Sequence, residues 1–344
     1  MRMYPVLFAA ALMAMICTAQ SQEITDLFSN IKLSDTSVSG DVAGDQLRLD
    51  LSSDGQTLQT RTLNLDGPGT YVSEWNYPEA DKGSYDVCAS VLREGTVQSA
   101  RCYTFFNAGQ TPVRFDVRDF NADSNGIHLS ILSADPTIVN IYYMLITGNK
   151  ALYISKDESV VISSGMPMEI DRPWNQILQD GQEYSGLVKI VEINSNLTRA
   201  FMNSFIAKDN AKITETYEDE TGASATVLGD SRVPFAGKLE FILSQNGTVL
   251  QIVEKKTPVL LTGKDETVEI SWNNTLSPGI YQLRIILLGN TGDVLDMKES
   301  IIEAKPIVVP ANTTVQQKES PLPEAAAFVA LATAVFLRRR ITRQ

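Results

Sequence analysis

Two cysteines, Cys88 and Cys102, are the residues in this chain of 344 whose type and spacing most readily suggest chemistry. Such a pair could form a disulfide, bind a metal ion or supply a nucleophile, but the last two uses would want a nearby histidine or further thiols. Alternate side chains after Tyr85 share one face of a strand, so Cys88 points to the other face. A three-residue hairpin loop at 94–96 would place it opposite Cys102. We therefore predict a cross-strand disulfide in an exported protein, with a metal or nucleophilic pair as the alternative.

His128 is the only histidine, so a Ser-His-Asp or Cys-His relay would have to be built around it. It alternates with Ile127 and Leu129, which is typical of a half-exposed strand residue. The chain contains none of the short motifs of serine hydrolases, zinc proteases, redox dithiols or phosphate-binding loops. We predict a protein that is not an enzyme and needs no cofactor. Hydrolysis by a carboxylate pair stays open, because Asp and Glu are too numerous to single out two.

Residues 121–126 resemble the start of a calcium loop, with oxygen-bearing side chains at alternate positions before Gly126. The twelfth position is Leu132, however, where a calcium loop of the EF-hand type supplies a glutamate, and no helical pattern flanks the segment. The sequence favours a polar β-turn here. A calcium site is the alternative, and no bound metal is expected.

A tryptophan followed by a turn and a tyrosine recurs three times along the chain. The tryptophans lie 99 and 98 residues apart, and a period of about 100 residues matches one β-sandwich domain rather than a solenoid repeat. The recurring residues are Trp75 and Tyr85, Trp174 and Tyr184, and Trp272 and Tyr281. Tryptophan rings could stack on sugars, whereas recurrence in every repeat favours a structural role in each core.

These positions resemble the core tryptophan and the tyrosine corner of immunoglobulin-like sandwiches. The resemblance covers residues 23 to 305. It differs from antibody domains in lacking their inter-sheet disulfide. The resemblance implies an all-β fold of three tandem immunoglobulin-like domains at 23–107, 111–210 and 211–305. Strand patterns agree with it, since residues 47–51 alternate apolar and polar side chains and residues 239–243 repeat the pattern. Residues 141–146 are nearly all apolar, which suits a strand covered on both faces.

The charge balance argues against nucleic acid as a partner. The chain has 29 basic and 41 acidic residues and a formal net charge of −12, and four of its arginines stand together near the C-terminus. Binding to a phosphate backbone needs clustered Lys and Arg. An acidic, well-solvated surface is the simpler interpretation.

Both ends of the chain carry short apolar segments. Residues 1–19 have Arg2, an apolar run and small residues before the predicted cleavage site. This layout is typical of a secretory signal peptide, which forms a short helix. The alternative is a lipoprotein with a lipid-modified Cys17. Residues 306–323 have the composition of an extended stalk. Within residues 324–344, a helical run at 325–337 would reach only about 20 Å, short of the roughly 30 Å hydrocarbon core.

This C-terminal segment resembles the sorting signals that archaeosortases and exosortases recognise. The residues that carry the resemblance are Pro323, Glu324 and the cluster of Arg338, Arg339 and Arg340, which flank the short apolar run. The resemblance implies a prokaryotic, archaeal surface protein that is cut near Pro323 and passed to a lipid anchor. The alternative is a retained, short membrane-spanning helix with the arginines on the cytoplasmic side.

The sequence thus predicts an exported protein anchored at the membrane, with its N-terminal domains outside. It would have a non-enzymatic function in adhesion, envelope structure or assembly. Its expected partners are proteins of the envelope or other surface proteins, and also glycans. The alternative is an extracellular carbohydrate-binding module of an envelope or hydrolase system. Four sequons are candidate glycan acceptors on the exterior, in an organism with the machinery, at Asn196, Asn246, Asn273 and Asn312.

Overall fold

The computed structural model describes residues 21–77, 81–107 and 114–305, which form strands and connecting turns without a helix. The predicted signal helix, the stalk, the C-terminal apolar helix, Asn312 and the sorting residues Pro323, Glu324, Arg338, Arg339 and Arg340 lie outside these residues. Within them, no helix has the length and apolar character needed to cross a membrane. The all-β fold class is therefore confirmed for the described part of the chain.

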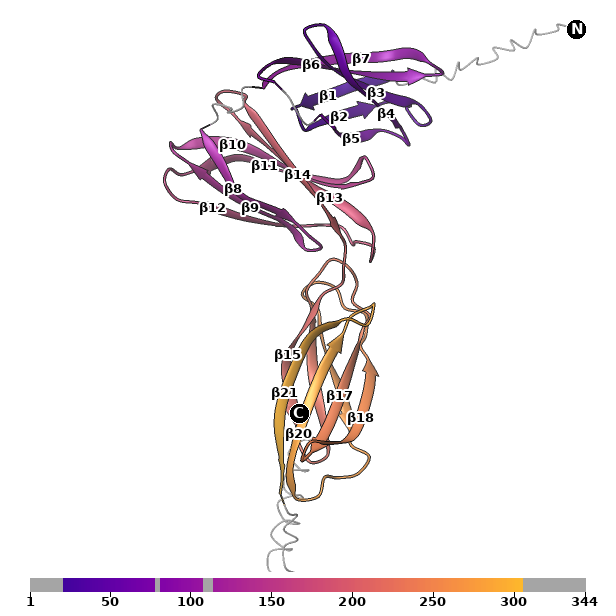
Figure 1. The fold of residues 1–344 in the computed structure, drawn as a ribbon, viewed down its shortest axis with the longest axis vertical. Coiled ribbons are helices and arrows are strands. Elements are labelled where there is room, and N and C mark those ends of the chain that lie inside the picture. Colours follow the sequence, from indigo (N-terminus) through magenta and orange to yellow (C-terminus); the bar gives the residue numbers. More distant parts are fainter. Residues whose placement is uncertain (1–20, 78–80, 108–113, 306–344) are drawn as a thin grey trace, which may run out of the picture. The chain divides into compact units, whose positions relative to one another are not determined.

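The strands fall into three consecutive sets of seven (Figure 1). The first set comprises β1 (Glu23–Ser29), β2 (Leu33–Ser39), β3 (Gln46–Ser53), β4 (Gln56–Asn64), β5 (Gly69–Glu74), β6 (Gly83–Arg93) and β7 (Thr96–Asn107). The second set comprises β8 (Phe115–Ala122), β9 (Gly126–Ser133), β10 (Thr137–Thr147), β11 (Lys150–Ile162), β12 (Met168–Pro173), β13 (Glu183–Glu192) and β14 (Thr198–Ile206). The third set comprises β15 (Ala211–Glu218), β16 (Gly222–Gly229), β17 (Lys238–Gln245), β18 (Thr248–Lys256), β19 (Asp265–Ser271), β20 (Gly279–Leu288) and β21 (Val294–Ala304).

Each set pairs its strands in the same antiparallel order, with three strands in one layer and four in the other. The four-stranded layers are β4-β3-β6-β7, β11-β10-β13-β14 and β18-β17-β20-β21. The three-stranded layers are β1-β2-β5, β12-β9-β8 and β15-β16-β19. This repeated order is consistent with three β-sandwich repeats.

Inward-facing side chains of the two layers form one hydrophobic core in each set. Leu47, Leu49 and Leu51 alternate into the first core, and Leu239, Phe241 and Leu243 occupy the matching positions in the third. Their hairpins also match, because each carries a bulge after the third apolar residue and a two-residue turn with positive φ, at Asp54-Gly55 and Asn246-Gly247.

The first and second sets are joined by a fourth hydrophobic cluster and by one backbone pairing. Lys150 of β11 pairs with Tyr71 of β5, which links β1-β2-β5 and β11-β10-β13-β14 into one sheet of seven strands. The cluster between them contains Phe28, Leu33 and Val72 from the first set, with Met144, Ile146, Leu187 and Ala200 from the second. The prediction for residues 141–146 is confirmed, since alternate residues of the run face the second core and this cluster.

Gly186 of β13 offers a test of core packing in the second set. An added Cβ at this position would lie 2.3 Å from the Cβ of Ala122 and 3.4 Å from the ring of Trp174. We expect Gly186→Ala to lower the free energy of unfolding by roughly 1–3 kcal/mol, because the close-packed core must shift to make room. Denaturant unfolding followed by tryptophan fluorescence measures this. Gly83→Ala is the matched control, since nothing lies within 4 Å of its added Cβ; equal effects of the two changes would contradict this account of the packing.

Candidate binding surface

The three repeated tryptophans are buried in the cores of their sets. The ring Nε1–H of Trp174 donates a hydrogen bond to the carbonyl of Asp123 at 2.7 Å, and that of Trp272 donates to the carbonyl of Asp219 at 3.0 Å. Trp75 instead donates to the hydroxyl of Ser34 at 2.9 Å. A sugar-stacking platform would need an exposed ring face, and none of the three presents one.

The repeated tyrosines are buried as well, and their hydroxyls bind the turn that precedes their own strand. Tyr85 donates to the carbonyl of Asp81 and Tyr281 to that of Ser277, each at 2.9 Å and four residues upstream. The hydroxyl of Tyr184 accepts a hydrogen bond from the backbone N–H of Gln179 at 3.1 Å. Each tyrosine therefore fixes the turn into the strand it opens, as a tyrosine corner does.

The segment that resembles a calcium loop forms a turn between β8 and β9. Its Asp123 carboxylate accepts hydrogen bonds from the backbone N–H groups of Asn125 at 2.7 Å and Gly126 at 3.3 Å. Asp219 makes the equivalent bonds to Thr221 and Gly222 between β15 and β16. These carboxylates act as turn caps, and in the described ranges no group of three or more His, Cys, Asp or Glu side chains is placed to hold a metal ion.

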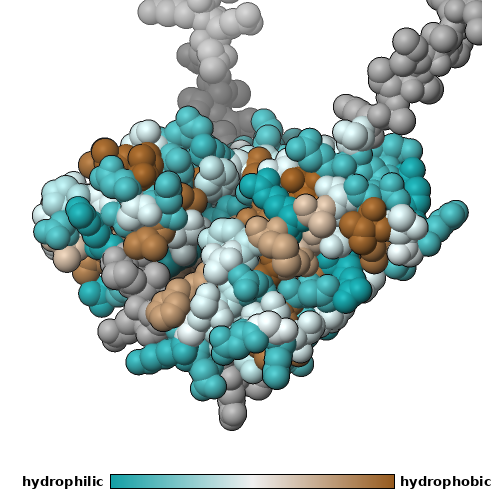
Figure 2. Space-filling model, turned by 90° about the horizontal axis from the view of Figure 1, so that it is seen from above, coloured by the Kyte–Doolittle hydropathy of each residue, from teal (hydrophilic) through white to brown (hydrophobic). Residues whose placement is uncertain are grey.

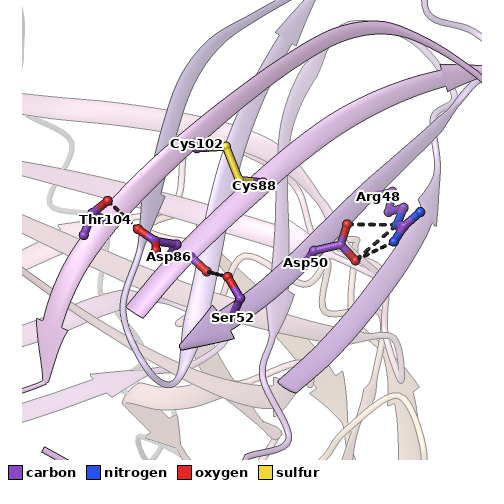
Figure 3. The surroundings of a disulfide bond; sticks show 7 residues. All are labelled: Arg48, Asp50, Ser52, Asp86, Cys88, Cys102 and Thr104. Atoms are coloured by element: carbon purple, nitrogen blue, oxygen red, sulfur yellow. Dashed lines mark hydrogen bonds and ion pairs between the residues drawn. A yellow bond between two sulfur atoms is a disulfide. The ribbon is translucent and has the colours of Figure 1, made fainter. Parts of the chain in front are cut away.

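Cys88 and Cys102 form the predicted disulfide across β6 and β7, with the sulfur atoms 2.04 Å apart (Figure 3). The predicted loop length was wrong, because the hairpin has a two-residue turn at Glu94-Gly95, both with positive φ. A bulge between Val91 and Leu92 restores the register that places the cysteines opposite each other.

The disulfide lies on the outer face of β4-β3-β6-β7, among polar side chains. On this face Arg48 contacts Asp50, and the hydroxyl of Thr104 donates to the carboxylate of Asp86 at 2.5 Å (Figure 3). A face of this kind is stable in water without a cover.

The same register position, three residues after the repeated tyrosine, is used differently in each set. The first set has Cys88 opposite Cys102, the second has Leu187 opposite Met202, and the third has Arg284 opposite Glu299. In the second set this outer face is buried against the first set. The inner faces are thus repeated while the outer faces differ.

The outer face of β18-β17-β20-β21 in the third set is exposed and rich in apolar side chains. Ile252, Ile280 and Ile301 are 54%, 66% and 68% exposed, and Val249, Val294 and Met297 are also exposed. Ile242 and Gln282 line a shallow depression of about 580 Å³ together with Val249 and Ile301. We call this region the open face.

Two ion pairs cross the open face between its strands. Arg284 on β20 contacts Glu299 on β21 at 2.7 Å, and Lys238 on β17 contacts Glu254 on β18 at 2.7 Å. Apolar residues with a few fixed charges are typical of protein interfaces. On the face seen in Figure 2, by contrast, hydrophilic and intermediate residues predominate and the hydrophobic ones lie in small separate groups.

The sequons at Asn196, Asn246 and Asn273 are exposed, as a glycan acceptor must be. Asn196 and Asn246 lie in turns with positive φ. Asn246 stands in the β17–β18 hairpin, directly beside the depression of the open face.

His128 lies on the outer face of β12-β9-β8, surrounded by carboxylates. Its Nδ1 is 2.8 Å from Asp171, and its Nε2 is 3.4 Å from Glu169 and 4.0 Å from Asp119. The hydrogen bond to Asp171 is the main cause that raises the pKa of the imidazole above 6.5, and the three negative charges add to it. The charged imidazolium is therefore stabilised in the folded state.

We expect the NMR titration midpoint of His128, the only histidine, to lie above 6.5 in tag-free protein and to fall in Asp171→Asn. The pKa of His128 is higher in the folded than in the unfolded protein. Its contribution to folding stability is therefore fully present below pH about 6.5 and is lost as pH rises through the folded pKa. Asp54→Asn, in a distant hairpin of the first set, is the control and should leave the midpoint unchanged. A wild-type midpoint at or below 6.5 would show that the carboxylates do not hold the imidazolium.

No family model matches the chain, and no curated protein matches it. Among solved structures, a tetra-tandem repeat in the extending region of a large adhesion protein is 10% identical with a TM-score of 0.26, covering 83% of this chain and 75% of that one. Trypsin-activated alpha-2-macroglobulin from Escherichia coli is 11% identical with a TM-score of 0.24, covering 84% of this chain and 24% of that one. Red sea bream transglutaminase is 8% identical with a TM-score of 0.25, covering 58% of this chain and 32% of that one. Likenesses this low do not assign a function.

Proposed function

We propose that this is a non-enzymatic, surface-anchored extracellular protein that serves adhesion, envelope structure or assembly through the open face of its third set. The observation that carries the proposal is the pattern of the outer sheet faces. The matching face of the second set is apolar and buried against strands of the first set, whereas the open face has apolar residues and no cover among the described residues. Several exposed apolar side chains gathered on one sheet face are a feature of protein interaction sites.

The partner that suits the open face is another protein of the envelope. Ile252, Ile280 and Ile301 would supply apolar contact area, and the Arg284–Glu299 and Lys238–Glu254 pairs would fix the orientation of the partner. The Cys88–Cys102 disulfide supports an oxidising, extracellular setting. The exposed sequons Asn196, Asn246 and Asn273 are compatible with that setting.

We expect the double variant Ile252→Asp with Ile301→Asp to weaken binding to isolated cell envelopes by at least about tenfold, because two carboxylates would be placed in an apolar contact. Co-sedimentation of purified protein with envelopes measures it. Val97→Asp with Val161→Asp is the matched control, since both valines are exposed on the other two sets.

Wild-type binding by the open-face variant, with the fold intact by circular dichroism, would contradict the proposal. A glycan array run on the same proteins examines the carbohydrate-binding alternative. Selective glycan binding that survives in the open-face variant would favour a carbohydrate-binding module.

We also propose that the chain is processed near Pro323-Glu324 and held at the membrane by a lipid anchor. The apolar run at 325–337 is short for a permanent span and is bracketed by Pro323-Glu324 and by the arginine cluster at 338–340. C-terminal peptide mapping of protein from native envelopes is expected to find no peptides from residues 325–343. Their recovery in the mature protein would leave a single-span membrane anchor instead.

A further inference from the structure

A lysine and an aspartate are buried together where the first and second sets meet. The Nζ atom of Lys189, on β13, lies 2.9 Å from Oδ1 of Asp35, on β2, and the two side chains are 8% and 1% exposed. The residues are far apart in sequence, so the contact joins the two strand sets. A buried ion pair contributes little net stability, because its desolvation penalty can exceed the attraction between the charges.

The carboxyl group of Asp35 is incompletely satisfied. Its Oδ2 atom is buried and has no hydrogen-bond partner among the described residues. Burial raises the pKa of Asp35, which favours the neutral acid. The pKa of Lys189 is raised as well, because the attraction of Asp35 and Asp26 outweighs its burial, so the neutral amine is a minor form that the reaction draws on. Passing one proton from Lys189 to Asp35 would give a neutral amine beside a neutral carboxylic acid without bringing any charge in from solvent.

The surroundings of the pair are aromatic and apolar on one side and acidic on the other. The Nζ of Lys189 lies 5.4 Å from the ring centre of Phe28 and 5.3 Å from that of Tyr142. A second carboxylate, Asp26, has its Oδ2 at 3.5 Å from the same nitrogen, and its side chain is 55% exposed. The pair therefore has a shielded side and a carboxylate that reaches solvent.

We propose that Lys189 and Asp35 become joined by an isopeptide bond that links the first and second strand sets covalently. The neutral Nζ attacks Cγ of the protonated Asp35, and a C–N bond forms. The Asp26 carboxylate takes a proton from the nitrogen and passes it to the departing hydroxyl, so the Cγ–O bond breaks and one water leaves. No oxidant or reductant is needed, because the reaction is the condensation of an amine with an acid.

Three features of the structure favour this reaction. Holding the amine against the acid replaces an encounter in solution with a reaction inside one molecule, which raises the effective concentration. The Oδ2 atom of Asp35 has no hydrogen bond among the described residues that would have to break when the carboxyl group reacts. The product replaces two buried charges with one neutral amide, which removes the cost of desolvating them.

The test is a tryptic peptide map of the reduced, full-length folded protein by mass spectrometry. We expect peptide 33–48, which contains Asp35, to be found joined to a peptide in which Lys189 is uncut, with a combined mass lower by one water. Recovery of 33–48 unmodified, together with quantitative cleavage after Lys189, would overturn the proposal. This measurement uses the wild-type chain and does not depend on any variant folding.

Variants then test the assigned roles. Lys189→Arg and Asp35→Ala should abolish the joined peptide, and Asp26→Asn should slow its appearance after refolding while leaving both reacting groups in place. Lys150→Arg is the matched control, since Lys150 makes an exposed ion pair to Asp66 between the same two sets at 2.6 Å. A joined peptide that forms at the wild-type rate in Asp26→Asn would overturn the proton relay.

Discussion

The requirement that residues 141–146 be covered on both faces shapes the N-terminal two thirds of the described structure. Nearly every residue of this strand is apolar, so burial of the outer face of β11-β10-β13-β14 removes a large apolar area from water. The sheet β1-β2-β5 supplies the cover, with Phe28, Leu33 and Val72. That burial also places Lys189 beside Asp35, out of water.

Repetition in this protein concerns its cores rather than its surfaces. Each tryptophan and tyrosine pair fixes a sandwich from within, and the same bonds to turns recur with small changes. The outer faces are then free to differ. One carries a disulfide, one is packed against a neighbouring sheet, and one presents isoleucines to solvent.

Local patterns in the sequence were enough to predict the strand runs at 47–51, 141–146 and 239–243 and the opposition of the two cysteines, since these depend on alternation and on turn residues a few positions apart. The contact of Lys189 with Asp35 could not be predicted in this way, because its partners are far apart in the chain and nothing local marks a lysine as buried. The open face was missed for a related reason. Ile280 and Ile301 stand in strands with apolar residues on both faces, and sequence alone does not say which face has a neighbour. The hairpin loop after Arg93 was misjudged because the bulge at Val91 and Leu92 has no sequence signal.

The cover over residues 141–146 also sets an order of events during synthesis. Chains are made from the N-terminus, so the strands that bear Phe28, Leu33 and Val72 leave the ribosome well before β10, β13 and β14. Until those later strands follow, the β1-β2-β5 sheet has an apolar side without its counterpart, and such transient surfaces are prone to aggregation. In the growing chain, the first sandwich therefore leaves these three side chains in water until β10, β13 and β14 have been made.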